Sequence, residues 1–267
     1  MRTLCTKKSA FSLVELSIVL VILGLLTGGI LGGQSLIRAA ELRAVSTEAT
    51  RYVTAAQTFR DKYFALPGDF RDATRFWGRM NGNADCVTNS SAAVNSAGAC
   101  DGNGDGILDQ GTAATTSGEF VQIWRQLQLA GLIEGTYTGL TGSGGFGHCV
   151  IGTDCPRSKL NNAGWGAGYR ISGDSNSYAL DYNNYIRIGA SNTTSIPGAP
   201  ILRPEEAWNI DTKIDDEKPA QGKVIATFWN NLCAAADDGS HANNDLVASY
   251  RLSDTTNQCS LYYRQIF

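Results

Sequence analysis

Residues 11–33 read FSLVELSIVLVILGLLTGGILGG, an apolar run with a single charged residue, Glu15. At a rise of 1.5 Å per residue, a helix over this run would span about 35 Å, enough to cross a bilayer core of ~30 Å. Residues 1–10, MRTLCTKKSA, carry three basic side chains and no acidic one. Basic residues before an apolar span hold that end in the cytoplasm and send the rest of the chain outward. The stretch therefore predicts a membrane-spanning helix with the C-terminal bulk of the chain outside.

The small residue Ala10 distinguishes this N-terminus from an ordinary signal peptide. A secretory signal peptide has its small cleavage residues after the apolar run, whereas Ala10 lies before it. Cleavage between Ala10 and Phe11 would leave the apolar segment on the mature protein. We therefore expect residues 1–10 to form a leader that is removed.

Glu15 is the unusual residue of the span. An acidic side chain inside a membrane costs about 2.5–3.5 kcal/mol, so it needs a partner. No basic residue lies between Phe11 and Gly33. The nearest cation would be a new α-amino group on Phe11, in the same chain or in a neighbouring one. In the alternative interpretation, Glu15 lies near the lipid headgroups and stays hydrated.

The residues KKSA followed by FSLVELSIVLVILGLL resemble the N-terminal signature of type IV prepilins, which include the pseudopilins of type II secretion. This signature combines a short basic leader, a small residue, Phe, and an apolar run with Glu fifth in the mature chain. Ala10 stands where the family usually has Gly. The resemblance implies cleavage by prepilin peptidase after Ala10, N-methylation of Phe11, and polymerisation into a helical filament at an inner-membrane assembly platform. It also implies that Glu15 neutralises the N-terminal amine of a neighbouring subunit.

The cysteine count agrees with an exported protein. The chain has seven cysteines, and removal of the leader takes away Cys5. Six cysteines allow fifteen pairings, but their spacing favours three local loops, and disulfides persist in an oxidising compartment such as the periplasm. Ligation of a metal by thiolates is the alternative, and it lacks a CxxC pair. The favoured pairs are Cys86–Cys100, Cys149–Cys155 and Cys233–Cys259.

The helix is predicted to continue through residues 34–65 and to end before Pro67 and Gly68. Apolar side chains recur there every three or four residues, which is typical of one helical face, while Glu48 is placed with the charged residues on the other faces. The apolar face is expected to pack on a sheet, and a coiled coil with another chain is the alternative. Its members are Leu42, Val45, Ala49, Tyr52, Ala56, Phe59 and Tyr63.

Four glycines in the apolar run, Gly28, Gly29, Gly32 and Gly33, weaken the helix by about 1 kcal/mol each relative to alanine. Two interpretations remain open. The glycines allow close packing between helices, or they allow local unwinding in an assembled filament, which resembles what pilins do at a similar depth.

Residues 66–267 are predicted to form a globular head of α+β class, pilin-like, with the long helix packed on an antiparallel sheet. Strands are expected at 177–182, 185–190, 223–229 and 259–267. Thr116 to Glu119 resemble a capping box that opens a helix, and Pro204 suits the first turn of another.

The segment from Asp101 to Asp109 matches the spacing of a calcium loop. Such a loop places oxygen donors at positions 1, 3, 5 and 9 and a backbone carbonyl at position 7. Thr112 stands where the loop usually has a bidentate Glu, so either Glu119 would have to reach back or water would fill the gap. The expected ligands are Asp101, Asn103, Asp105, Ile107, Asp109 and Glu119. The alternative is a turn without an ion.

A second acidic cluster, Asp211, Asp215, Asp216 and Glu217, is interleaved with lysines and is expected to form an exposed charged turn or a subunit contact. Two carboxylates of this kind could serve a glycosidase, but the sequence has no nucleophile elbow, Walker A loop or dinucleotide fingerprint. We therefore expect no enzyme.

The composition narrows the function further. A formal charge of -3 argues against general nucleic-acid binding. The leading hypothesis is a structural subunit of a type IV pilus or a type II secretion pseudopilus, anchored in the inner membrane with its head in the periplasm. Two alternatives stay open: a minor tip pilin that binds a receptor, a glycan or DNA, and a plain single-span anchor that does not assemble.

Overall fold

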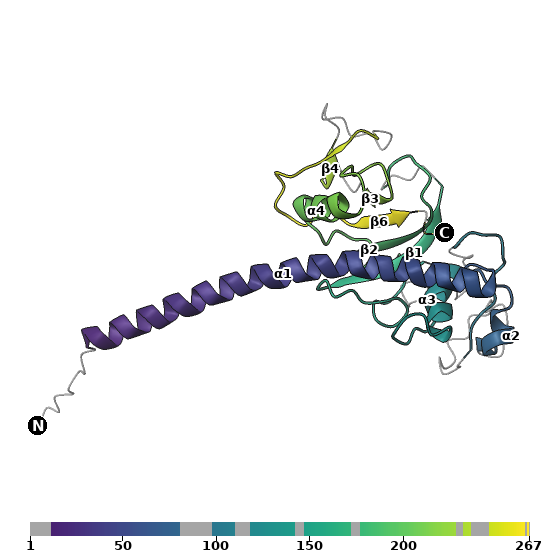
Figure 1. Ribbon diagram of the computed structural model, residues 1–267, viewed down its shortest axis with the longest axis horizontal. Helices are drawn as coiled ribbons and strands as arrows, with labels where there is room; N and C mark the ends of the chain where they lie inside the picture. The colour runs from purple at the N-terminus through teal and green to yellow at the C-terminus, as the bar shows by residue number, and fades with distance from the viewer. Residues whose placement is uncertain are drawn as a thin grey trace, which may run out of the picture. The chain divides into compact units, whose positions relative to one another are not determined.

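The structure is a computed structural model that describes residues 12–80, 98–109, 118–141, 147–171, 177–227, 232–235, 246–264 and 266. The chain forms two compact units, Met1–Glu41 and Leu42–Phe267. Helix α1, Leu13–Tyr63, begins in the first unit and ends in the second (Figure 1). The prediction that the helix continues past the apolar run and ends before Pro67 is confirmed.

The described part of the first unit is Ser12 and the N-terminal part of α1, as far as Glu41. The large apolar side chains between Leu13 and Ile37 are exposed. By length and composition this part of the helix could cross a membrane. A Cβ atom added at Gly28, Gly29 or Gly32 would meet no atom within 4 Å. No contact within the described chain therefore requires glycine at these positions.

In the second unit, one face of α1 packs against the head. Val45, Tyr52 and Phe59 are buried in the main core. The ring of Tyr52 lies 5.2 Å from that of Trp124 in helix α3 (Glu119–Leu129) and 5.6 Å from that of Trp165 in strand β1 (Ala163–Arg170). The predicted apolar face is therefore buried within the same chain, against a strand and a second helix.

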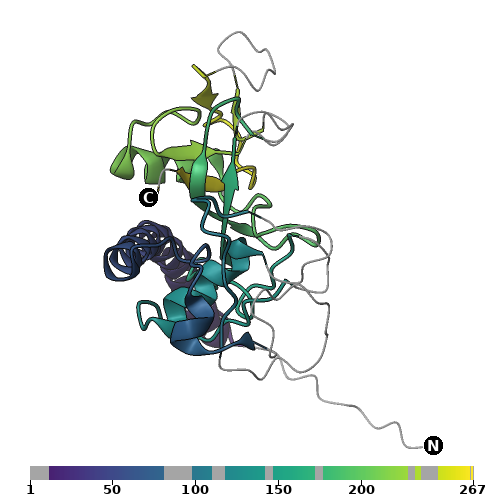
Figure 2. The same ribbon diagram turned by 90° about the vertical axis from the view of Figure 1, so that its right-hand side faces the viewer.

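The head contains a four-stranded sheet in the order β1-β2-β6-β3, and each neighbouring pair is antiparallel. Figure 2 shows these strands beside α1. The mixed α+β class, with a long helix and an antiparallel sheet, is confirmed. The strands are β1 Ala163–Arg170, β2 Asn183–Ala190, β3 Val224–Ala226 and β6 Leu261–Arg264. A separate pair joins β4 Ala234–Ala235 to β5 Ser249–Tyr250.

The strand predictions were correct in part. The strand expected at 185–190 is confirmed within β2, and those expected at 223–229 and 259–267 are shorter, as β3 and β6. The prediction of a strand at residues 177–182 is wrong. There the segment closes a local turn, because the amide of Tyr178 donates to the hydroxyl of Tyr182, and both rings are buried.

Strand β1 has no counterpart among the predictions. Its sequence, AGWGAGYR, lacks the β-branched residues that favour strands. Its glycines leave room for other segments instead. A Cβ atom on Gly166 would lie 2.7 Å from the Cβ of Ile196, so the loop that carries Ile196 packs directly on the strand.

The helices of the head follow the predictions more closely. Helix α4, Pro204–Ile214, begins with the predicted proline. Helix α3 is present, but the predicted capping box is wrong. The N-cap is Gly118 with no side-chain cap, and the Glu119 side chain hydrogen-bonds to a neighbouring loop. Thr116 and Ser117 lie outside the described residues. The short helix α2, Ala73–Trp77, was not predicted.

Candidate functional site

The N-terminal end of α1 carries the predicted assembly residue. Glu15 lies in the first turn of the helix, and its Oε2 accepts a hydrogen bond from the backbone N–H of Ser12 at 2.9 Å. This contact turns the carboxylate toward the start of the helix. Ala10 and Phe11, the predicted cleavage and methylation residues, lie outside the described residues.

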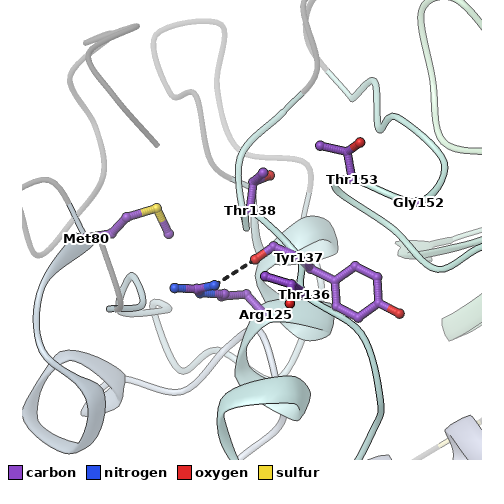
Figure 3. A pocket seen from close by; sticks show the side chains of 7 residues that line it. All are labelled: Met80, Arg125, Thr136, Tyr137, Thr138, Gly152 and Thr153. Atoms are coloured by element: carbon purple, nitrogen blue, oxygen red, sulfur yellow. Dashed lines mark hydrogen bonds between the residues drawn. The ribbon is translucent and has the colours of Figure 1, made fainter. Parts of the chain in front are cut away.

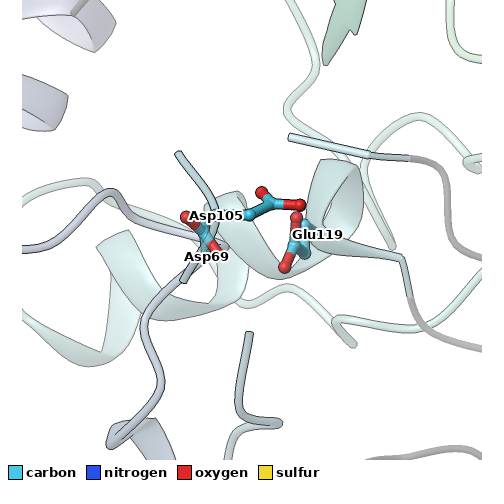
Figure 4. A group of neighbouring side chains, drawn as sticks. All are labelled: Asp69, Asp105 and Glu119. Atoms are coloured by element: carbon cyan, nitrogen blue, oxygen red, sulfur yellow. The ribbon is translucent and has the colours of Figure 1, made fainter. Parts of the chain in front are cut away.

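A group of three carboxylates forms in the head, beside the start of α3. Oxygen atoms of Asp69, Asp105 and Glu119 lie within 4.8 Å of one another. Figure 4 shows the three side chains converging from three separate segments. The structure thus brings together two of the predicted calcium ligands, Asp105 and Glu119, and adds Asp69. These carboxylates could bind a metal ion.

Asp69 reaches this group because its loop lies against α3. The amide of Gly68 donates to Gln126 Oε1 at 2.6 Å, and a Cβ atom on Gly68 would lie 2.6 Å from the carbonyl oxygen of Glu119. Gly68 also has a φ of +97°, which glycine adopts readily. Only glycine at position 68 therefore allows Asp69 this close to Glu119. The sequence showed Pro67 and Gly68 as the end of a helix, but nothing in it linked Asp69 to a loop more than thirty residues away.

The backbone of the 101–109 loop wraps around the buried carboxylates. The amide of Gly106 donates to Asp69 at 2.8 Å, and that of Asn103 donates to Glu119 at 2.9 Å. Burial, helped by the nearby charges of Asp69 and Asp109, raises the pKa of Glu119 to about 8 against these hydrogen bonds. Burial also raises the pKa of Asp69. The hydrogen bonds from the loop therefore offset only part of the cost of burying these carboxylates.

The other predicted ligands occupy different positions around the loop. Both carboxylate oxygens of Asp101 accept hydrogen bonds from Thr74, at 2.7 Å from its amide and 2.8 Å from its hydroxyl. Asn103 lies beside Asp105, with its Nδ2 2.9 Å from Asp105 Oδ2. The amide of Ile107 donates to Asp105, and that of Asp109 donates to Glu119. Asp101 is therefore tied to the start of α2, outside the three-carboxylate group.

Two of the three predicted disulfides are confirmed. Cys149 bonds to Cys155, and Cys233 bonds to Cys259. Cys100 is also disulfide-bonded. Its predicted partner, Cys86, lies outside the described residues, so that pairing stays a prediction.

The head also has a cavity of about 170 Å³, shown in Figure 3. Arg125 lies at its wall, and its Nη1 donates to the carbonyl of Tyr137 at 2.9 Å while its Nε donates to that of Gly98. Burial lowers the pKa of this guanidinium. Ligand pockets are usually larger, at roughly 300–1,000 Å³. The charge of Arg125 thus serves to hold loops of the head together.

An exposed aromatic surface lies where α1 ends and α2 begins. Phe64 is 93% exposed and Phe76 is 58% exposed. They line a shallow hollow together with Tyr63, Lys62 and Arg75. Exposed aromatic rings next to cations are typical of binding surfaces.

The comparisons with known proteins agree with the N-terminal features. The model of the prokaryotic N-terminal methylation motif matches residues 5–31. No curated protein and no solved structure is similar enough to the chain to count as a match. The motif and the long apolar helix together fit a type IV pilin-like protein. They imply a filament-forming precursor of pilin or pseudopilin type, processed by prepilin peptidase, and they fit membrane anchoring.

Proposed function

We propose that this chain is a structural subunit of a type IV pilus or a type II secretion pseudopilus, and that its work is assembly rather than catalysis. Residues 1–10 are the leader, 11–33 the membrane and filament-core segment, 34–65 its amphipathic continuation, and 66–267 the periplasmic head. Prepilin peptidase cleaves after Ala10, and Phe11 is then N-methylated.

One observation carries this proposal. The large apolar side chains from Leu13 to Ile37 are all exposed, and none of the residues in the most apolar stretch of α1 is buried. A folded protein leaves so much contiguous apolar surface open only for a membrane or for other proteins. Lipid covers this surface before assembly, and helices of neighbouring subunits cover it in the filament.

Glu15 supplies the pairing step. Its carboxylate already lies at the N-terminal end of α1, hydrogen-bonded to the amide of Ser12. Cleavage creates an amine on Phe11, the residue before Ser12. The Phe11 amine of an incoming subunit can then pair with the Glu15 carboxylate of its neighbour. This pairing is favourable because an unpaired carboxylate is costly in an apolar environment.

The mature N-terminus tests processing, and Glu15 tests assembly. We expect mass spectrometry of the mature protein to find N-methylated Phe11 as the first residue. We expect Glu15→Gln to abolish filaments while the head stays folded, because the substitution removes the charge and keeps the size. Ser17→Ala, on the same exposed segment, is the control and should assemble.

Two results would contradict the proposal. One is a mature protein that keeps residues 1–10. The other is a Glu15→Gln protein that assembles as well as the control.

We further propose that the three carboxylates Asp69, Asp105 and Glu119 bind calcium. All three side chains offer oxygen, the ligand that calcium prefers, and two of them are buried. Asp101 is left out of this set because it already pairs with Thr74, whereas Asn103, Ile107 and Asp109 stay predicted ligands. Extracellular modules of this kind bind calcium with a Kd of about 10⁻⁴–10⁻³ M.

The aromatic surface at Phe64 and Phe76 supports a second candidate function, that of a tip pilin. Exposed rings flanked by Lys62 and Arg75 suit single-stranded DNA, whose bases stack on aromatic rings and whose phosphates attract cations. Phe64→Ala with Phe76→Ala should then weaken DNA binding about tenfold or more without affecting assembly. Binding that is unchanged, or absent from the unsubstituted protein, would remove this candidate.

A further inference from the structure

A second group of carboxylates forms where helix α4 ends. Oxygen atoms of Asp211, Asp215 and Asp216 lie within 4.8 Å of one another. The expectation of an exposed turn is wrong for Asp211, which is fully buried. Asp215 is half-buried and Asp216 is exposed. The group thus extends from the interior to the surface, and an ion could enter from solvent.

Asp211 has a buried carboxylate oxygen without a hydrogen bond of normal geometry within the described residues. Its Oδ2 accepts a hydrogen bond from the hydroxyl of Tyr250 at 2.9 Å. Its Oδ1 is buried and accepts no hydrogen bond of normal geometry within the described residues, although the nearby backbone N–H of Glu217 lowers the pKa of this carboxyl group. Buried polar atoms are nearly always paired, because an unpaired one loses its hydration without compensation. The open oxygen belongs to the residue that shares a group with two other carboxylates, and a cation bound by the group would supply its partner.

The negative charge gathered at the C-terminal end of α4 also favours the binding of a cation. The C-terminal end of a helix carries a partial negative charge, which favours cations and disfavours carboxylates. Here three carboxylates gather at the end of α4. Within the described residues, neither Lys213 nor Lys218 forms an ion pair with any of them. Lys218 contributes only its backbone amide, which donates to Asp216 at 3.1 Å.

We propose that Asp211, Asp215 and Asp216 bind one divalent cation, with calcium as the ion of best fit. Calcium–oxygen distances of about 2.3–2.6 Å place ligand atoms on opposite sides of the ion no more than about 5.2 Å apart, which agrees with the observed spacing. An all-oxygen set suits calcium or magnesium, and calcium tolerates irregular protein sites better. This proposal is independent of filament assembly and of the group at Asp105.

Such an ion would fasten three parts of the head. Asp215 accepts hydrogen bonds from the amides of Lys223 and Val224, at the start of β3. A Cβ atom on Gly222 would strike Asp215 Oδ2, so the turn is fitted closely to this carboxylate. Tyr250, the partner of Asp211, lies in β5. Binding would therefore hold the end of α4 to β3 and to β5.

The test is a count of bound calcium per full-length chain in detergent micelles. Equilibrium dialysis at 0.1–3 mM calcium compares Asp211→Asn, Asp216→Asn and the control Asp254→Asn, all on an Asp105→Asn background that removes the other acidic group. We expect the background and the control to bind one ion. Asp211→Asn and Asp216→Asn should bind none, or bind at least tenfold more weakly.

Two further results keep the test decisive. Should Asp211→Asn fail to fold, Asp216→Asn decides the matter, because that side chain is exposed and accepts its hydrogen bond from the backbone amide of Lys218. Equal binding by the background and by Asp216→Asn would overturn the proposal, and so would a background protein that binds no calcium and no magnesium.

Discussion

The carboxylate of Glu48 accepts a hydrogen bond from the indole Nε1 of Trp165 at 2.8 Å, in the interior of the head. The same carboxylate accepts hydrogen bonds from the hydroxyl of Ser158 at 2.6 Å and the amide of Lys159 at 2.9 Å. Glu48 is only 6% exposed and Trp165 is fully buried. Three donors from one segment of the head thus converge on a single acid in α1, and they fix how this part of the helix lies on β1.

Replacement of Glu48 should destabilise the head more than any surface substitution in α1. Glu48→Ala leaves buried donors on Trp165 and Ser158 unpaired, and each unpaired group costs about 1–3 kcal/mol. We expect the free energy of unfolding to fall by about 3 kcal/mol or more in denaturant titrations followed by tryptophan fluorescence. Asp61→Ala, at an exposed acid of the same helix, is the control and should cost less than about 1 kcal/mol. Equal losses in the two variants would contradict this role of Glu48.

Glu48 also shows where sequence reasoning reached its limit for the fold. The spacing of Tyr52 and Phe59 predicted correctly which face of α1 is buried. Helical periodicity treats a charged residue as exposed, so it placed Glu48 on the wrong side. The donors that make its burial favourable come from Ser158, Lys159 and Trp165, more than a hundred residues away. Local patterns carry no information about such partners, and for the same reason the glycine-rich strand β1 was missed.

The glycines of the apolar run should matter for assembly and not for the isolated chain. Gly28→Ala with Gly29→Ala adds methyl groups where the chain itself has open space, and each raises helix propensity by about 1 kcal/mol. We expect equal or higher helicity by circular dichroism in micelles, together with impaired filament formation. Ser35→Ala in the same helix is the control and should assemble normally. Normal filaments from the double variant would remove both interpretations of these glycines.

Asp154 should make the stability of the head depend on pH. It is 4% exposed, and burial raises its pKa above the ordinary value of 3.8, although hydrogen bonds from Thr138 and Val150 and the charge of His148 lower it. The folded chain therefore binds more protons at this group than the unfolded chain does. Stability is highest with Asp154 protonated, and it falls as the pH rises from about 3.8 through the higher folded pKa.

The measurement is the free energy of unfolding between pH 3 and pH 7. Asp154→Asn should reduce the fall, because asparagine does not ionise. Asp254→Asn is the matched control, because Asp254 is only partly buried and hydrogen bonds from Thr256 lower its pKa, the opposite direction. A pH profile of Asp154→Asn that parallels that of the unsubstituted protein would rule out this contribution.

The sequence predicted the candidate sites unevenly, and the reason is again the range of the contacts. Glu15 could be identified because its signature lies within a short stretch of residues. The calcium-loop spacing pointed to Asp105 and Glu119, whose carboxylates do lie close together, although their binding of calcium stays a prediction. Asp69 was missed because only the packing of the Gly68 turn on α3 brings it there. The sequence alone could not show that Asp101 is occupied by another contact. That contact is with Thr74, which lies in helix α2, and the sequence did not predict this helix.

Calcium should stabilise the head through the group that contains Asp105. To measure this effect alone, the other acidic group must first be removed by substitution. On an Asp216→Asn background, the group at Asp69, Asp105 and Glu119 is the one of the two acidic groups that remains intact. Calcium at ten times its Kd should then raise the free energy of unfolding by about 1.4 kcal/mol, because it binds only the folded state. Chelation should reverse the shift. Adding Asp105→Asn should abolish it, since that carboxylate is the exposed member through which an ion enters. Adding Asp72→Asn, a nearby acid outside the group, should leave it intact. A shift that survives Asp105→Asn would place the ion elsewhere, and a background protein without any shift would show that these three carboxylates hold no calcium.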